Sequence, residues 1–276
     1  MGAAIHRPPQ AQGGKLVSPL AASGAVPSLE FGGVATNDSG SVRSVSLVEA
    51  YDRWAETYDA PNPLHALEER ILGLLLPALA GKRVLDVACG TGRWLEKLLG
   101  WGAPSGFGVD LSAGMLRRAA EKPPLRGRCV RGDCLALPFK SASADLIMCS
   151  LAAGHVHDLG GLARELARVA NREADAFVTD FHPLAHARGW RRTFHDGHET
   201  LEVPSTAHTV ERFRLVFERE GFRVAVRVEP HLGEPERRVF AQRGRADLFL
   251  GACEVPALTI FHFKRSDSAA TKENRG

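Results

Sequence analysis

The fold of this chain is decided by residues 83–92, which read RVLDVACGTG. The first part of this stretch is short and mostly apolar, which is typical of a strand buried inside a parallel sheet. Gly90 and Gly92 follow it, and glycine permits positive φ and lets a ligand approach the backbone closely. A helical pattern begins at Trp94, so the free N–H groups of a helix N-terminus would face the same ligand. The stretch therefore predicts a strand, a ligand-binding loop and a helix in succession.

Outward from this stretch, apolar runs that suit strands alternate with segments of helical spacing. We expect strands at 83–88, 106–110, 129–133, 144–150, 175–181, 222–228 and 258–263. We expect helices at 64–76, 94–101, 112–120, 158–170 and 209–220. Strands that alternate with helices of this length form βαβ units. The sequence thus predicts an α/β fold, in which a parallel sheet carries helices on both faces.

The composition excludes several classes of protein. The 276 residues include 35 Lys and Arg and 32 Asp and Glu, which gives a net charge of +3. Basic and acidic residues are too evenly balanced for a strongly basic nucleic-acid binder. The five cysteines show no paired spacing, so they indicate neither a disulfide framework nor a zinc ribbon. Reduced thiols are typical of a cytoplasmic protein. No apolar run approaches the ~20 residues that a membrane helix needs.

The chain divides into one domain and two tails. Residues 1–46 are rich in Gly, Ala, Ser, Val and Pro and have no helical period, which predicts a flexible N-terminal tail. We expect a single domain at 47–265 and a polar C-terminal tail at 266–276. Within the domain, residues 184–207 are predicted to form a lid or a substrate-selecting insertion, because ligand choice in α/β enzymes resides in such loops.

Two acidic residues end neighbouring strands of the predicted sheet, at the edge where ligands bind. Asp110 lies 18 residues after Gly92, and a carboxylate there can accept from both hydroxyls of a ribose. Asp133 ends the next strand and could accept from an adenine amino group. The common dinucleotide fingerprint would need glycine at position 95, where the chain has Leu95, and a Walker lysine is also absent. The pattern therefore predicts a nucleoside ligand bound by a different motif.

Four stretches together carry a family resemblance: VLDVACGTGRWLEKLL, GVDLSAGMLRRA, RGDCLALPF and ADLIMCSLAAGHVHDL. They resemble the class I S-adenosylmethionine-dependent methyltransferases, and especially the small-molecule group related to the ubiquinone and menaquinone biosynthesis enzymes. The resemblance covers roughly residues 47–265, and it is specific for cofactor and fold rather than for substrate. It implies a Rossmann-like, doubly wound sheet of seven mostly parallel strands, with the last strand antiparallel. Ala88 stands where many members have a glycine, and this small residue should still permit the turn.

The resemblance also implies which residues bind S-adenosylmethionine. Asp86 and the glycine loop would line its methionine end, Asp110 would hold the ribose, and Asp133 would border the adenine. Tyr51 and Tyr58 lie in a segment that resembles the family's cofactor-covering element. The implied cofactor-binding residues are Tyr51, Tyr58, Asp86, Ala88, Cys89, Gly90, Gly92, Asp110, Leu111, Met115, Asp133, Cys134, Leu135, Ser150, Leu151 and His155.

The expected reaction sets what the protein must supply. The methyl group on a sulfonium is already activated, so we expect in-line displacement, with catalysis that comes from holding the acceptor in position. A general base helps if the acceptor is a hydroxyl, and histidine is the usual choice. We predict His182 and His208 as candidate bases, with His155 as the third. Residues 195–199, HDGHE, suggest a metal site, but zinc needs three or four ligands, and no metal is predicted.

Three functions are compatible with these patterns. The first is methyl transfer to the oxygen, nitrogen or carbon of a small molecule, with S-adenosylhomocysteine as the product. The second is methylation of RNA or of a protein side chain, which would need a basic face such as 188–195 together with Arg237, Arg238, Arg243 and Arg245. The third is a non-catalytic protein that binds the cofactor and regulates a partner. The intact glycine loop and both acids favour an enzyme, and the near-neutral charge favours a small acceptor over nucleic acid. A monomer and a homodimer both remain open.

Overall fold

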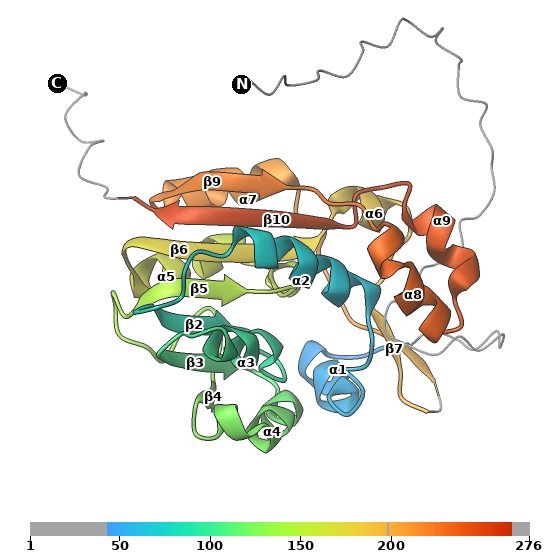
Figure 1. The fold of residues 1–276 in the computed structure, drawn as a ribbon, viewed down its shortest axis with the longest axis horizontal. Helices are drawn as coiled ribbons and strands as arrows, with labels where there is room; N and C mark the ends of the chain where they lie inside the picture. Colours follow the sequence, from blue (N-terminus) through green and yellow to red (C-terminus); the bar gives the residue numbers. More distant parts are fainter. Residues whose placement is uncertain (1–42, 198, 267–276) are drawn as a thin grey trace, which may run out of the picture.

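Seven strands form the main sheet, in the order β4-β3-β2-β5-β6-β10-β9 (Figure 1). The computed structural model of the chain describes residues 43–197 and 199–266, so most of both predicted tails lies outside the described residues. Strand β2 pairs in parallel with β3 and β5, whereas β10 pairs antiparallel with β6 and β9. The predicted α/β sheet, mostly parallel with an antiparallel last strand, is confirmed. The strands are β2 (Arg83–Val87), β3 (Ser105–Asp110), β4 (Cys129–Arg131), β5 (Ala144–Cys149), β6 (Ala170–Phe181), β9 (Phe222–Val228) and β10 (Leu258–Arg265).

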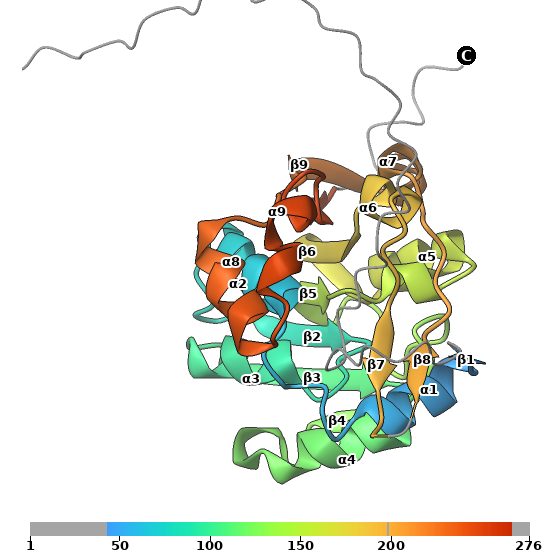
Figure 2. The ribbon, with the colours of Figure 1, turned by 90° about the vertical axis from the view of Figure 1, so that its right-hand side faces the viewer.

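Helices cover both faces of this sheet. Figure 2 shows α5 and α7 on one face and α2, α3 and α8 on the other. The main helices are α2 (Pro63–Leu75), α3 (Arg93–Gly100), α4 (Ala113–Glu121), α5 (Leu159–Val169), α7 (Val210–Arg219), α8 (Glu234–Gln242) and α9 (Phe249–Ala252). Within the described residues, no helix has the length and apolar character that a membrane crossing requires.

The period of two along a strand explains why both faces are apolar. In β5, Leu146 and Met148 belong to the core cluster that contains Leu67 of α2. Ile147 alternates with them and belongs to the cluster that contains Leu162 of α5. Successive side chains of a strand point to opposite faces, so a continuous apolar run buries both faces at once.

Four helices begin at a residue whose side chain caps the helix. The side chain of Asn62 accepts a hydrogen bond from the backbone of α2, whose first residue is a proline. Ser112, Asp158 and Thr209 accept in the same way at the starts of α4, α5 and α7. Each side chain satisfies an N–H group that has no partner within its helix, which fixes where the helix begins.

Strand β6 and the region before β10 differ from the sequence prediction. Strand β6 begins at Ala170 rather than at 175, and its register against β5 shifts between Ala144 and Leu146. Helices α8 and α9 occupy a region to which the sequence analysis assigned no element. Helix α8 buries Glu236 against Arg70 of α2, and the bond between Arg70 Nε and Glu236 Oε1 is 2.8 Å long. This contact joins residues far apart in the chain, so no local periodicity of the sequence could predict it.

A three-stranded sheet in the order β1-β8-β7 lies beside the main sheet. It consists of β1 (Arg43–Ser44), β7 (Thr193–His195) and β8 (Thr200–Glu202), so residues 43 and 44 of the predicted tail belong to the fold. The predicted insertion 184–207 also contains most of α6 (Pro183–Ala187). Its Phe194 stacks on Trp54 of α1 (Leu47–Trp54), with ring centroids 5.2 Å apart. The insertion thus packs on the first helix.

Candidate active site

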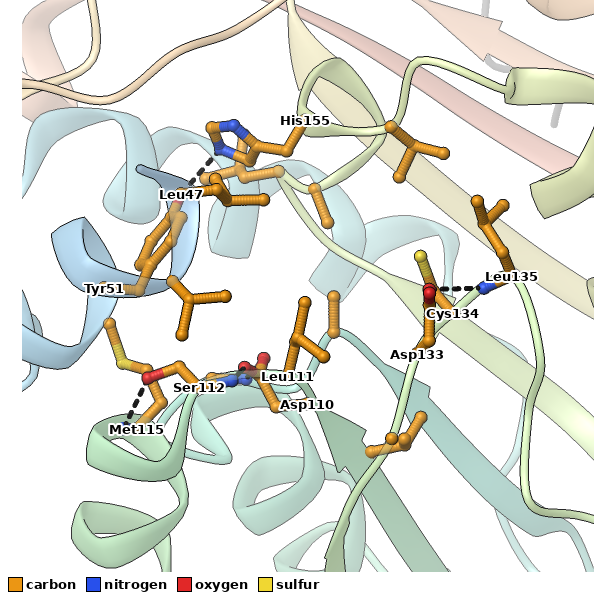
Figure 3. Close-up of a pocket in the computed structure, with 18 of the residues that line it drawn as sticks. Leu47, Tyr51, Asp110, Leu111, Ser112, Met115, Asp133, Cys134, Leu135 and His155 are labelled. Atoms are coloured by element: carbon orange, nitrogen blue, oxygen red, sulfur yellow. Dashed lines mark hydrogen bonds between the residues drawn. The ribbon is translucent and has the colours of Figure 1, made fainter. Parts of the chain in front are cut away.

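A cavity of about 350 Å³ lies at the carboxyl ends of β2, β3, β4 and β5 (Figure 3). The residues that follow these strands line it, as ligand sites of open α/β sheets do. Helix α1 adds Leu47, Val48 and Tyr51 to the wall. The cavity is therefore bounded by the sheet edge and by the first helix of the described fold.

The glycine loop forms one wall of the cavity. Ala88, Gly90 and Gly92 have φ values of 55°, 55° and 73°, so the turn forms with alanine at its first position. A Cβ atom on Gly90 would lie 3.9 Å from Met115 Sδ and from a ring carbon of Tyr58. The missing side chain at Gly90 therefore leaves backbone exposed to whatever occupies the cavity.

Both predicted carboxylates line the cavity, and each also holds backbone in place. Asp110 Oδ2 accepts from Gly90 N at 2.7 Å, and Oδ1 accepts from Ser112 N at 2.8 Å. Burial raises the pKa of Asp110 overall, although its backbone hydrogen bonds oppose the rise. Asp133 Oδ1 accepts from Leu135 N at 2.9 Å. A carboxylate oxygen that accepts one bond keeps a lone pair, so both groups can still accept from a ligand.

A tyrosine–histidine pair lies on the same cavity wall (Figure 3). Tyr51 Oη lies 2.7 Å from His155 Nε2, and His155 Nδ1 lies 2.8 Å from the carbonyl oxygen of Pro204. A carbonyl only accepts, so Nδ1 carries the ring proton and Nε2 accepts from the Tyr51 hydroxyl. Burial raises the pKa of Tyr51 to about 12 and lowers the pKa of His155 to about 3. Both groups are therefore neutral at pH 7, and their hydrogen bond is directional.

Asp52 ties α1 to the start of α4. Its Oδ1 accepts from Ser112 Oγ at 2.6 Å and from Gly114 N at 2.7 Å. A Cβ on Gly114 would lie 2.8 Å from the backbone of Asp52, so glycine is required for this close approach. Burial raises the pKa of Asp52, but these hydrogen bonds outweigh it and the net pKa is lowered. The ionised carboxylate thus holds the first helix against the cavity.

A buried glutamate supports the cavity from below. Glu68 of α2 is fully buried and accepts from Ser150 Oγ at 2.8 Å, and Ser150 itself lines the cavity. Its other oxygen accepts from Trp94 Nε1 at 3.0 Å and pairs with the Arg93 guanidinium. Thr179 of β6 also donates to it. One carboxylate therefore links α2, α3, β5 and β6 under the site.

The match to a known family follows this geometry. A family model described as "Methyltransferase domain" matches residues 84–173, which hold the glycine loop and both carboxylates of the cavity. The chain carries a class I S-adenosylmethionine-dependent methyltransferase domain.

Relatives and solved structures agree with this assignment. The domain is 34% identical over 155 residues to a demethylmenaquinone methyltransferase of Roseiflexus sp. (strain RS-1), covering 51% of this chain and 63% of that protein. It is 33% identical over 151 residues to a malonyl-[acyl-carrier protein] O-methyltransferase of Halorhodospira halophila, covering 53% of this chain and 51% of that protein. The match thus spans about half to two thirds of these relatives. A methyltransferase structure from Mesorhizobium loti shares the fold at a TM-score of 0.58 and 22% identity, covering 74% of this chain and all (100%) of that one.

The structure brings most of the predicted cofactor residues to the cavity of the methyltransferase domain. Those that line it are Tyr51, Tyr58, Ala88, Gly90, Asp110, Leu111, Met115, Asp133, Cys134, Leu135, Ser150, Leu151 and His155. The other three do not line the cavity: Asp86 lies in β2, and Cys89 and Gly92 lie in the loop that follows it. Asp86 is buried and accepts from Leu95 N at 3.0 Å, and burial raises its pKa to about 8.

Two of the three predicted bases lie away from the cavity of the methyltransferase domain. The His182 ring accepts from Leu184 N at 3.1 Å through Nδ1, and its Nε2 faces Glu229 at 2.9 Å. The His208 ring faces the Val156 carbonyl at 3.0 Å. Both rings hold loops in place, and neither lines the cavity. Of the predicted bases, only His155 lies on the cavity wall.

Sequence reasoning missed several residues of the wall. Leu47 and Val48 lie on the same helix as Tyr51, and the spacing of three and four residues could have pointed to them. Ser112, the N-cap of α4, also lines the cavity and was not among the predicted site residues. Asp52 left no signal, because its partners are 60 and 62 positions away.

Two acidic residues of the HDGHE segment contact the first helix. Asp196 and Glu199 both accept from Arg53 Nη2 of α1. His198 lies outside the described residues, and among those described no group of three or more His, Cys, Asp or Glu side chains could hold a metal ion. The segment thus contributes an ion-pair contact to the first helix.

Proposed function

We propose that this chain is an enzyme that transfers the methyl group of S-adenosylmethionine to a small-molecule acceptor. The observation that carries the proposal is the cavity itself, in which the glycine loop, Asp110 and Asp133 line one space at the carboxyl edge of the sheet. The two curated relatives are named for a quinone precursor and for a malonyl group on a carrier protein, so the family relation supports the reaction rather than one acceptor.

The residues around the cavity fit S-adenosylmethionine. Asp110 and Asp133 can accept from the hydroxyls and the amine of an adenosine, and Leu111, Met115 and Leu135 supply apolar surface for its ring. When bound, the cofactor supplies an electrophilic methyl group on a sulfonium. The protein contributes position and exclusion of water, because an acceptor held on axis gains much of the rate enhancement from its orientation.

Tyr51 and His155 form a hydrogen-bonded pair on the cavity wall along which a proton can pass. The proton of a hydroxyl acceptor would pass to Tyr51 Oη while the phenol proton passes to His155 Nε2, along the 2.7 Å bond already present. The resulting imidazolium would keep its Nδ1 proton on the Pro204 carbonyl, at 2.8 Å. Because burial lowers the pKa of His155 to about 3, His155 can take this proton only as the methylated oxygen becomes strongly acidic during the transfer. On that condition we propose His155 as the proton acceptor, acting through Tyr51.

The basic residues considered for RNA binding are mostly engaged with acids. Arg188 pairs with Glu254, and Arg237 pairs with Glu234. Arg192 is buried against Asp180. These arginines contribute little free positive charge to a surface, which supports a small acceptor over a polyanion.

Calorimetry with S-adenosylhomocysteine tests the proposed function. The chain should bind this product, and Asp110→Ala should weaken the binding by roughly 10- to 100-fold, the worth of hydrogen bonds to a charged group. Asp145→Ala is the matched control, because Asp145 pairs with Arg83 at the opposite edge of the same sheet. Equal affinities for all three proteins would contradict the assignment of the cavity.

Tyr51→Phe tests the proton pathway, because it keeps the ring and removes only the hydroxyl. Binding of S-adenosylhomocysteine should stay within about twofold, while methyl transfer to hydroxyl acceptors should fall by about 10²- to 10⁴-fold, the usual worth of a general base. Tyr58→Phe is the control, since Tyr58 lines the same cavity. Undiminished transfer by Tyr51→Phe would remove this residue from the proton pathway.

A further inference from the structure

Two cysteine side chains meet over β3, beside the glycine loop. Cys89 is the loop residue directly before Gly90, and Cys129 is the first residue of β4, the edge strand of the main sheet. Gly108 of β3 lies between them. A Cβ atom at Gly108 would lie 2.7 Å from Cys89 Sγ and 3.1 Å from Cys129 Sγ. Both sulfur atoms therefore occupy the space over Gly108 that a side chain at this position would fill.

The two thiols are hydrogen-bonded to each other, and this bond distinguishes their chemistry. The Cys89 thiol donates to Cys129 Sγ, and this bond, together with burial, raises the pKa of Cys89 well above its usual value. The same bond lowers the pKa of Cys129, although burial opposes the effect. All five cysteines lie in the described residues, and only Cys129 has a lowered pKa. Cys129 is also half-buried, whereas Cys89 is buried, so Cys129 is the nucleophile of the pair.

The position of Cys89 couples this pair to the cavity. The residues on either side of it, Ala88 and Gly90, both line the cavity. The Cys89 N–H donates to the Val109 carbonyl at 3.0 Å, and its carbonyl accepts from Gly92 N at 2.8 Å. A disulfide holds its two sulfur atoms about 2.05 Å apart, which is closer than two hydrogen-bonded thiols can approach. Forming this bond would therefore draw Cys89 toward β4 and move the backbone of the loop.

We propose that a disulfide bond between Cys89 and Cys129 acts as a redox switch that weakens the binding of S-adenosylmethionine at the cavity. The effect on the cofactor rests on the proposed function, whereas the formation of the disulfide does not.

The oxidant in this step is a peroxide. The Cys129 thiolate attacks one peroxide oxygen and breaks the O–O bond, so that Cys129 becomes a sulfenic acid. The other oxygen leaves as hydroxide and takes up the proton that the Cys129 thiol released, which gives one water from hydrogen peroxide. The Cys89 sulfur then attacks Cys129 Sγ, and the sulfenic hydroxyl leaves as a second water with the proton of the Cys89 thiol. Two electrons pass from the sulfur atoms to the peroxide, and a dithiol reductant reverses the change.

Mass spectrometry of the full chain treated with hydrogen peroxide tests the bond. Wild type should lose the mass of two hydrogen atoms, and digestion without reductant should give the Cys89 peptide joined to the Cys129 peptide. Cys89→Ser should instead accumulate a sulfenic acid at Cys129, which dimedone traps. Cys253→Ser is the matched control, because Cys253 is also half-buried but its pKa is raised by burial. This control should form the disulfide as wild type does.

Calorimetry with S-adenosylhomocysteine measures the consequence for the cavity. Oxidised wild type should bind about tenfold more weakly than reduced wild type, the worth of one hydrogen bond to a charged group such as the bond from Gly90 N to Asp110. Dithiothreitol should restore the affinity. Cys129→Ser should bind equally before and after peroxide, and Cys129→Ala replaces it if the serine variant does not fold.

Each other outcome has a definite meaning. Wild type that keeps both thiols free after peroxide, or that joins a different pair of cysteines, would overturn the switch. A disulfide between Cys89 and Cys129 that leaves the affinity unchanged would overturn it as well. Cys129→Ser retains Met115 of the cavity wall, so an equal loss of affinity in that variant would assign the effect to methionine oxidation instead. Failure of reduced wild type to bind S-adenosylhomocysteine would refute the proposed function, whereas peptide mapping reports the disulfide independently.

Discussion

Replacing Glu68 should test whether the charge network beneath the cavity stabilises the fold. The Glu68 carboxylate is fully buried and accepts from Ser150, Thr179, Trp94 and Arg93. In Glu68→Leu the Arg93 guanidinium would lose its countercharge while its side chain stays only 14% exposed. Breaking a buried pair in this way costs about 3–5 kcal/mol of the free energy of unfolding.

Glu68→Gln should cost less, because its amide keeps the volume and can arrange its atoms to suit the neighbours. Its oxygen can accept from Trp94 and Arg93, while its NH₂ can donate to the Ser150 and Thr179 hydroxyls, which also accept. Only the charge is lost, so we expect a decrease of about 1.5–3 kcal/mol. We therefore predict that Glu68→Leu lowers the free energy of unfolding more than Glu68→Gln does.

Urea unfolding followed by tryptophan fluorescence measures these differences, with thermal unfolding as a second probe. A loss of about 3–5 kcal/mol corresponds to a fall in Tm of roughly 6–20 °C for a domain of this size. Glu69→Ala is the control, because Glu69 pairs with Lys97 at 2.8 Å but its side chain is 41% exposed. Such a surface pair should change stability by at most about 1 kcal/mol.

The reasoning would be refuted if Glu68→Leu lost less than about 1 kcal/mol, as an exposed pair does. The double variant Glu68→Leu, Arg93→Met should recover most of the loss, since it removes the stranded charge as well as the acceptor. Strict additivity of the two single changes would show that the pair is not coupled.

Three further predictions concern the sheet, the loop and the insertion. Asp175 is buried among a histidine and two lysines; burial raises its pKa, but their hydrogen bonds outweigh it and the net pKa is lowered. The stability that it contributes, measured by urea unfolding against Asp175→Asn, should be present above its unfolded pKa of about 3.9 and be lost as pH falls through the lower folded value. Gly92→Ala should destabilise by about 1–3 kcal/mol, because φ is 73° and the new Cβ would lie 2.2 Å from Leu125 Cδ1. Phe194→Ala should cost about 3–5 kcal/mol, since it removes a fully buried ring stacked on Trp54.

Controls separate these effects from general damage. Gly102→Ala also places alanine at positive φ, but its Cβ would meet open space, so it should cost less than Gly92→Ala. Leu250→Ala removes a side chain that is 72% exposed and should leave stability within about 0.5 kcal/mol. A difference between Asp175→Asn and wild type that stays constant from pH 7 to pH 2 would contradict the assigned linkage.

Much of the fold was predictable because its signals are local. Residues 83–92 show a buried strand and a glycine turn within ten positions, and the strand, the turn and the following helix all form as expected. Asp110 and Asp133 could be placed because Asp110 ends β3 and Asp133 follows the end of β4 by two residues, and parallel strands bring their carboxyl ends to one edge. Helix α8 could not be predicted, because its burial depends on a distant helix rather than on its own periodicity.

The candidate bases show where local reasoning fails. His182 follows a strand at the expected edge, yet its ring turns to cap α6 and to meet Glu229. His155 lies on the cavity wall and is hydrogen-bonded there to Tyr51. The two residues are 104 positions apart, so no local pattern of the sequence indicated this contact. Sequence position sets which edge a residue occupies, whereas packing decides where its side chain points.

The sequence by itself determined three features: the glycine loop, the two acids, and the alternation of strands and helices that builds a sheet with two apolar faces. These properties depend on backbone preference and on periods of two and 3.6, which neighbouring residues specify. Only the tertiary structure decided that Asp52 would hold α1 against the cavity and that the buried Glu68 would bond to Ser150 of the cavity wall. Those contacts join distant segments, and their energies come from burial and pairing of charge, which no short stretch of sequence contains.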